Sequence, residues 1–390
     1  TSLVLMAKTG MFAPFALYLI ALGVASLWLA YSRGWIALSW PGALGADLAV
    51  IGVTLRALSP QHQDLAGAAL LLQWLLLGAY VASIAVNTLV RHRRVTVLEV
   101  VQTVVALLIS FGGTLLMTRA TGSLPAAIGV ASLVFGLACY GVAYAFVETR
   151  EGLERNAYFY TTLALVLVLA GCALVLHEPW LGRAFAVLGV LAAARWNRVG
   201  RLNMLLHAAT YVVAAAIASG ALGYGAWALA AAPEGPWPLP RVTTVLVLAA
   251  TALTIVLAAA RPRPEGGVPA DGARVVMLLV LLWVASATVI GLLAPLIAGL
   301  PDRSVNLGAL ATLRTCVLAV AALLIAWVAR HARFREWAWL VYPLLVVVGL
   351  KMVVQDFQQS RPRTLFIALA LFGAALIIAP RLRRGSAKAG

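Results

Sequence analysis

Residues 305–329 read VNLGALATLRTCVLAVAALLIAWVA, and the basic segment RHARFR follows at 330–335. The apolar run is long enough to cross the hydrocarbon core of a bilayer, which takes about 20 helical residues. A cluster of arginines beside such a run is typical of the cytoplasmic end of a membrane span. Most other segments repeat this pattern, so it predicts an all-α, polytopic helical bundle in a membrane, with no soluble domain.

The composition of the whole chain supports this fold class. Hydrophobic residues make up 63% of the 390 residues and charged residues 11%, whereas soluble domains have about 45–50% and about 25%. The net charge of +16 does not indicate a nucleic-acid surface, because the basic residues form short clusters between apolar runs. We therefore expect membrane lipids and protein partners within the membrane, and no nucleic acid.

Apolar runs of roughly 18 to 25 residues predict about thirteen membrane spans. The second and the seventh of these, both short, could instead be tilted, re-entrant or interfacial segments. The predicted spans cover residues 11–31, 41–58, 65–90, 97–117, 124–147, 157–176, 180–196, 202–228, 242–260, 275–300, 305–329, 337–353 and 364–378.

The loop arginines predict an orientation. With these spans, most of them fall in alternate loops, which therefore lie on one side of the membrane. The positive-inside rule then places the C-terminus in the cytoplasm and Thr1 on the outer side of a bacterial cytoplasmic membrane. The first residues do not have the features of a secretory signal. We therefore expect a further helix before Thr1.

The longest connection, 261–274, is rich in proline and glycine and predicts a flexible cytoplasmic linker. It would divide a bundle of about nine helices in 1–260 from a bundle of about four helices in 275–390, which ends in a basic tail. Because every loop is short, no segment is long enough to form a nucleotide-binding domain. Neither GxxxxGK[ST] nor GxGxxG occurs in the sequence.

The sequence contains no catalytic or metal-binding pattern. Its three cysteines lie in apolar spans without a CxxC pair, and no group of His, Cys, Asp and Glu has the spacing of a metal site. There is no GxSxG motif. We therefore predict a protein that is not an enzyme and that uses no metal or cofactor.

Polar residues inside the predicted spans are the first set of candidate functional residues. Arg314 is near the middle of its span, where an arginine raises the free energy of membrane insertion by about 2.5–3.5 kcal/mol. It could pair with an acid such as Asp47 or Glu99, or its side chain could snorkel to the outer face. The full set is Asp47, Glu99, Gln102, His207 and Arg314.

The acids within this set allow two interpretations. Glu99 and Gln102 share a helix face that we expect to point into the bundle. Glu99 lies in the first helical turn, where the helix dipole favours an acid, so a structural role and a proton-coupled role are both open. For Asp47 the two interpretations are equally favoured. Polar stripes such as the one that contains His207 more often hold helices together than bind a substrate.

The C-terminal segment 340–384 reads LVYPLLVVVGLKMVVQDFQQSRPRTLFIALALFGAALIIAPRLRR. Its features are Gly349-Leu350-Lys351, Asp356 one and a half turns later, Arg363, a small and apolar span, and a basic end. This segment resembles the closing hairpin of uncharacterised bacterial membrane proteins of many spans, known only as a domain of unknown function. The resemblance implies a membrane protein of the cell envelope and supplies no activity.

The polar residues of this hairpin form the second set of candidates. They are expected at the outer face, either as an ion network that fixes the hairpin or as a site for an anionic head group. The residues are Lys351, Asp356, Arg361 and Arg363.

We expect a scaffold or accessory subunit of a larger membrane complex, because the loops are short and buried ionisable groups are scarce. Ala215, Ser219 and Gly223 recur every four residues and predict close helix packing, within the chain or against a partner. The alternative is a transporter or flippase for lipid-linked or amphipathic cargo, with Asp47, Glu99 and Arg314 lining a cavity. A solid core favours the scaffold, and a polar cavity open to one side favours the transporter.

Overall fold

The computed structural model describes residues 11–121, 125–147, 154–231, 237, 239–261, 268–298, 306–359 and 361–387. The described residues are 91% helical and contain no strand. The prediction of an all-α polytopic bundle is therefore confirmed. Thr1, the helix expected before it, and Lys388 in the basic tail lie outside the described residues.

The chain forms two compact units, Thr1–Val175 and Leu176–Gly390. Each unit has its own internal packing and is described by itself. The predicted linker at 261–274 falls within the second unit, and its residues 262–267 lie outside the described part of the chain. The division into 1–260 and 275–390 therefore stays a prediction.

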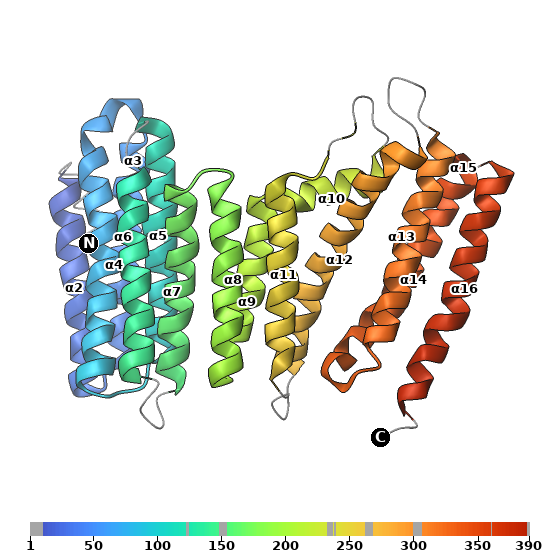
Figure 1. Cartoon of the computed structure of the whole chain (residues 1–390). Coiled ribbons are helices and arrows are strands. Elements are labelled where there is room, and N and C mark those ends of the chain that lie inside the picture. The colour runs from blue at the N-terminus through green and yellow to red at the C-terminus, as the bar shows by residue number, and fades with distance from the viewer. Residues whose placement is uncertain are drawn as a thin grey trace. The chain divides into compact units, whose positions relative to one another are not determined.

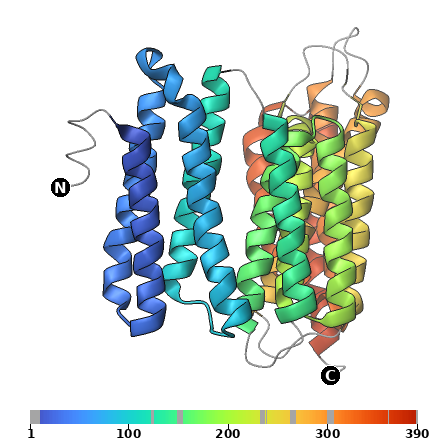
Figure 2. The ribbon, with the colours of Figure 1, turned by 90° about the vertical axis from the view of Figure 1, so that its left-hand side faces the viewer.

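Long helices that run side by side build the first unit (Figure 1), and α2 to α5 form a group of four (Figure 2). A tight 3-10 turn, η1 (Pro60–Leu65), precedes α4, and π-helical turns, η2 (Val86–Val90) and η3 (Ala143–Val147), end α4 and α6. The long helices are α2 (Phe12–Arg33), α3 (Ile36–Ala57), α4 (Ala66–Ala85), α5 (Val97–Thr121), α6 (Pro125–Val142) and α7 (Glu154–Val175).

The second unit contains the remaining helices, and α10 lies across the upper part of α12 (Figure 1). The turns are η5 (Ala332–Trp337) and the π-helical η6 (Met352–Asp356). The helices are α8 (Trp180–Val199), α9 (Leu202–Ala218), α10 (Ala221–Ala230), α11 (Val242–Ala260), α12 (Val268–Ile297), α13 (Leu307–Val328), α14 (Ala338–Lys351), α15 (Phe357–Gln359) and α16 (Pro362–Ala387).

Ten helices of the described residues are long and apolar enough to cross a membrane, or eleven if α9 and α10 count as one bent span. Each of the thirteen predicted spans falls on a helix, but the number thirteen is not reached. α3 and α8 are not in this set, and they correspond to the second and the seventh predicted spans, the two that could instead be tilted, re-entrant or interfacial. The arginines of α8, among them Arg183, Arg195 and Arg198, lower its hydropathy.

The predicted span 202–228 is broken in the structure. α9 ends at Ala218, and α10 leaves it at an angle of 66°. Gly220 makes the turn with a φ of +70°, which a glycine adopts without steric cost. The predicted ridge of small residues is split at this break, because Ser219 packs against Gly182 of α8 while Gly223 is exposed.

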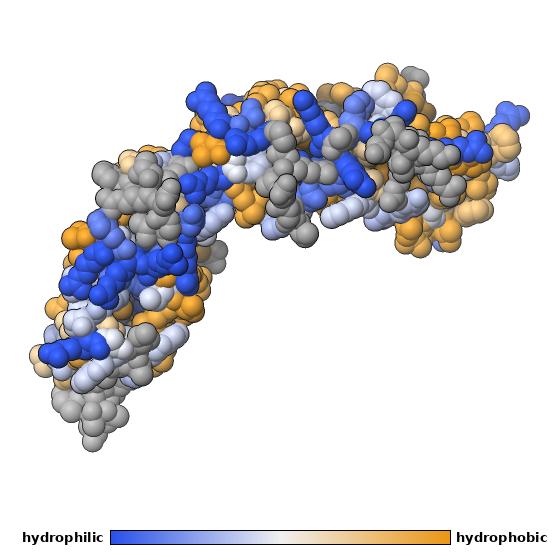
Figure 3. Space-filling view, turned by 90° about the horizontal axis from the view of Figure 1, so that it is seen from below, coloured by the Kyte–Doolittle hydropathy of each residue, from blue (hydrophilic) through white to orange (hydrophobic). Residues whose placement is uncertain are grey.

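The described arginines cluster where the helices of each unit end. In the first unit, exposed arginines end α2, follow η2 and begin α7, positions that the alternating helices bring to one end. Viewed from below, hydrophilic residues gather over the helix ends and apolar residues cover much of the flanks (Figure 3). An apolar belt with a basic end is the surface expected of a membrane protein.

Candidate functional site

In the first unit, buried polar side chains form a column along the facing sides of α3, α4 and α5. Seven-residue spacing places Gln73 and Tyr80 along one side of α4, and Asn87 follows seven residues later in the η2 turn that ends it. Each of these three residues lies in a different group of polar side chains. The groups are centred on Glu99 at the basic end, on Asp47 in the middle, and on Gln73 at the far end.

Glu99, at the basic end, is buried with 1% of its surface exposed. Its Oε1 accepts hydrogen bonds from the Tyr31 hydroxyl and from Asn87 Nδ2, the latter at 3.1 Å. Its Oε2 accepts from the backbone N–H of Thr96 at 2.5 Å, and its own N–H donates to Thr96 Oγ1 at 3.4 Å. This reciprocal pair is a capping box at the start of α5, which favours the structural interpretation of Glu99.

Asn156 holds the basic loop beside this group. Its Oδ1 accepts from the N–H of Val95 and its Nδ2 donates to the carbonyl of Arg93, both at 2.9 Å. Arg93 in turn donates to the Tyr31 carbonyl at 3.0 Å. The sequence interpretation missed Asn156 because it lies just before the predicted span 157–176.

The middle group joins two of the predicted candidates. Asp47 is 3% exposed, and its Oδ1 accepts a hydrogen bond from Gln102 Nε2 at 2.8 Å. Asp47 Oδ2 is also buried but has no hydrogen-bond partner, and the same is true of the Tyr80 hydroxyl. Asn87 Oδ1, in the Glu99 group, also lacks a partner, whereas buried polar groups are normally hydrogen-bonded.

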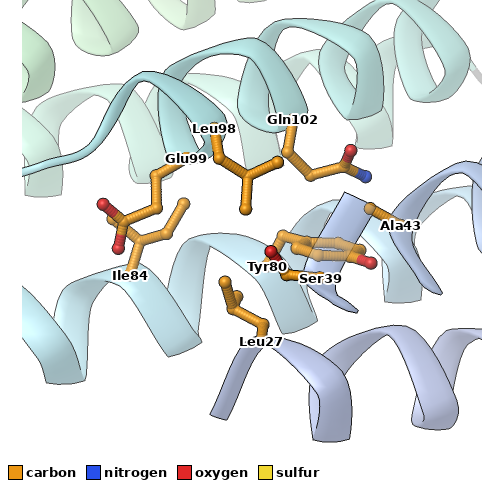
Figure 4. A pocket seen from close by; sticks show the side chains of 8 residues that line it. All are labelled: Leu27, Ser39, Ala43, Tyr80, Ile84, Leu98, Glu99 and Gln102. Carbon is orange, nitrogen blue, oxygen red and sulfur yellow. The ribbon is translucent and has the colours of Figure 1, made fainter. Parts of the chain in front are cut away.

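A small enclosed cavity lies between the Glu99 group and the middle group. Figure 4 shows Glu99 on one side of it and Tyr80 and Gln102 on the other. The cavity volume is about 10 Å³, which is close to the least space that holds one water molecule. The residues that line it are Leu27, Ser39, Ala43, Tyr80, Ile84, Leu98, Glu99 and Gln102.

Gln73, at the far end, is fully buried and has a partner for each side-chain polar atom. Its Nε2 donates to Thr54 Oγ1 at 2.7 Å, and its Oε1 accepts from Thr114 Oγ1 at 3.3 Å. A Cβ atom at Gly113 would lie only 2.3 Å from this Nε2, so the glycine provides the space for the amide. These contacts support the packing role predicted for polar stripes.

In the second unit, Arg314 of α13 is 2% exposed and binds the end of α10. Its Nε donates to the Ala228 carbonyl at 2.8 Å and its Nη2 to the Ala231 carbonyl. The last carbonyls of a helix have no partner within it and carry partial negative charge. Arg314 therefore caps α10, whereas Asp47 and Glu99, its predicted partners, bind other groups.

Lys351 and Asp356 form a buried ion pair next to Arg314, and Arg314 interacts electrostatically with Asp356. The Lys351 amine also donates to the Ala311 carbonyl at 2.5 Å and to Thr315 Oγ1 at 2.7 Å. The Thr315 hydroxyl donates to Asp356 Oδ2 at 2.5 Å. All three N–H groups of Lys351 are used within the chain, which favours the ion network over the head-group site.

The remaining predicted residues lie apart from these groups. Arg361 and Arg363 are exposed at the start of α16. His207 is buried in α9, with 3% of its surface exposed. Among the described residues, no group of three or more His, Cys, Asp and Glu could hold a metal ion.

Comparison of the chain with protein-family models, with curated proteins and with solved structures found no match.

Proposed function

We propose that this membrane-spanning protein is a non-enzymatic scaffold or accessory subunit of a larger membrane complex. The observation that carries this proposal is the use of buried charges for internal bonds. Glu99 caps α5, Arg314 caps α10, and Lys351 pairs with Asp356. Charged groups that are bonded in this way hold helices in place and leave little binding capacity for cargo.

The packing of the described residues supports the same proposal. The enclosed cavity of the first unit is about the size of one water molecule, which is far too small for a lipid-linked cargo. A hollow of about 230 Å³ in the second unit is open, and it lies at helix ends beside Glu178, Ser219 and Arg241.

A scaffold needs a surface for its partners, and α16 is the least buried of the apolar spans. It packs against α13 and α14, while large side chains such as Phe366 (72% exposed) and Ile377 (58% exposed) point away from them. We propose that such surfaces contact partner helices as well as lipids in a bacterial cytoplasmic membrane. The basic helix ends and the C-terminus would lie in the cytoplasm, and Thr1 would lie outside.

The test is native mass spectrometry of the protein released gently from its own membrane. A stoichiometric protein partner is expected. Photo-crosslinking residues at Phe366 and Ile377 should then capture this partner, whereas a matched position on α3, the exposed Leu44, should not. A chain that is released alone and carries one kind of lipid would overturn the scaffold proposal.

The second candidate is a transporter or flippase, and the observation that favours it is the unpartnered Oδ2 of Asp47. Ionisable groups that are not bonded within a membrane bundle are typical of proton-coupled carriers. This candidate predicts movement of amphipathic cargo in reconstituted vesicles, driven by a pH gradient and lost in Asp47→Asn. The scaffold proposal predicts no such movement in either protein.

A further inference from the structure

We propose that the open hollow of the second unit binds the head group of a zwitterionic phospholipid, which carries a phosphate and a primary ammonium. The proposal goes beyond the scaffold function and does not depend on it, because a lipid can be bound together with a protein partner. The hollow has a volume of about 230 Å³. An acid, a base and two hydroxyl side chains are among the residues that line it, which are Glu178, Pro179, Ser219, Arg241 and Thr243.

Three parts of the second unit meet around the hollow at one end of the unit (Figure 1). Glu178 and Pro179 precede α8, Ser219 lies at the break between α9 and α10, and Arg241 and Thr243 begin α11. The arginine-rich end of α8 is the opposite one. α11 is long and apolar enough to cross a membrane, so its first residues lie at the level of the lipid head groups.

A close contact between α8 and the helix break holds two walls of the hollow together. A Cβ atom at Gly182, in the first turn of α8, would lie 2.9 Å from Ser219 Cβ and 3.1 Å from the Ser219 nitrogen. A larger residue at position 182 would therefore push α8 away from the break. Because Gly182 follows Pro179 by three residues, the same contact keeps Pro179 beside Ser219.

The start of α11 supplies the groups that bind a phosphate. The Arg241 carbonyl accepts from the N–H groups of Thr244 and Val245, so the N–H groups before them have no partner within the helix. Helix N-termini of this kind are anion sites. Thr243 is only 7% exposed, yet its hydroxyl takes part in none of the described hydrogen bonds and is not among the fully buried polar atoms. This hydroxyl is therefore accessible from the hollow that Thr243 lines.

Glu178 and Arg241 give the hollow one charge of each sign. Arg241 Nη1 lies 3.6 Å from Glu178 Oε2, and the two side chains are 73% and 61% exposed. An exposed ion pair contributes little to stability, so both groups are available to a ligand. A simple anion beside Arg241 would be repelled by the Glu178 carboxylate. A zwitterion satisfies both residues, with its phosphate at Arg241 and α11 and its ammonium at Glu178.

The lining favours a primary ammonium over a quaternary one. Quaternary ammonium groups are typically bound by aromatic side chains, and none of the described residues that line the hollow is aromatic. The ring of Trp180, two residues after Glu178, already has the Arg183 guanidinium over it at 4.9 Å. The Glu178 carboxylate instead accepts hydrogen bonds, which a primary ammonium donates. The ligand that fits is therefore a phosphatidylethanolamine.

The test is native mass spectrometry of the delipidated full chain in detergent micelles, with phosphatidylethanolamine or phosphatidylglycerol added. The wild type should bind one phosphatidylethanolamine and bind phosphatidylglycerol, which lacks the ammonium, more weakly. Arg241→Gln should weaken phosphatidylethanolamine binding by roughly tenfold or more, because a charge-assisted bond to the phosphate is lost. Glu178→Gln should abolish the preference between the two lipids. Thr243→Val keeps the size of the side chain and should weaken the binding of both.

Two matched variants are the controls. Arg361→Gln, at the exposed start of α16, and Thr210→Val, at an exposed position on α9, should leave binding unchanged. Equal binding of the two lipids by the wild type, or undiminished phosphatidylethanolamine binding by Arg241→Gln, would overturn the proposal. Glycerophosphoethanolamine has the same head group without acyl chains and should not displace the lipid at equal concentration. Displacement would indicate a soluble ligand and overturn the assignment to a lipid.

Discussion

Removal of the Asp356 carboxylate is the sharpest perturbation of the ion network in the second unit. Asp356→Asn keeps the shape of the side chain but removes the only negative side chain bonded to Lys351 among the described contacts. Lys351 is 13% exposed and Asp356 is fully buried, so water can do little to replace the lost charge. Arg314 would also lose its electrostatic partner.

The expected loss of stability follows from these bonds. Asp356 takes part in two hydrogen bonds, one from Lys351 and one from Thr315, and bonds to charged groups contribute about 1.5–3 kcal/mol each. Breaking one partner of a buried pair costs about 3–5 kcal/mol. We therefore expect Asp356→Asn to lower the free energy of unfolding by roughly 3–5 kcal/mol. Lys351→Met should cost less, because Arg314 still balances the carboxylate.

A double-mutant cycle measures this coupling. Unfolding is followed by circular dichroism in mixed micelles with increasing sodium dodecyl sulfate, and the double variant should be little less stable than Asp356→Asn alone. Arg361→Gln, at an exposed position, is the control and should change stability by less than about 0.5 kcal/mol. If the losses of unfolding free energy in Asp356→Asn and Lys351→Met add up to the loss in the double variant, the two residues are not energetically coupled and the ion pair does not stabilise the unit.

Three further predictions use the same unfolding assay or amide exchange. Gly113→Ala should lower the free energy of unfolding by about 1–3 kcal/mol, because its Cβ displaces the Gln73 amide. The control is Gly112→Ala, whose Cβ meets nothing within 4 Å and which should be neutral or stabilising by up to about 1 kcal/mol. Equal effects of the two variants would contradict the packing of Gln73. Glu99→Ala removes the capping box and should lower the free energy of unfolding by about 1–2 kcal/mol. Glu99→Gln should retain most of that stability, because glutamine completes the same capping box. An equally large loss in Glu99→Gln would instead indicate that the charge is essential. Arg314→Leu should raise hydrogen exchange at the amides of α10, and unchanged protection there would refute the cap.

The apolar runs predicted the helices well, because a bilayer requires about 20 apolar residues per span and the sequence displays them directly. Contacts between helices were predicted less fully. The interior position of Gln102 followed from helical spacing, but its bond to Asp47 did not, because spacing within one helix says nothing about the rotation of another. Glu99 and Thr96 are an exception, since a capping box is local and can be read from adjacent residues.

Arg314 shows a second limit, because its partners are backbone carbonyls at a helix end that the composition does not reveal. The segment around Gly220 is uniformly small and apolar, so nothing in its hydropathy marks the break between α9 and α10. The break is nevertheless what makes the burial of charge possible. Lys351 and Arg314 bring two positive charges to one carboxylate, and the C-terminus of a helix supplies about half a negative charge. The C-terminus of α10 ends beside α13 and provides this charge to Arg314, so the turn at Gly220, which sets the direction of α10, and the buried arginine stabilise each other.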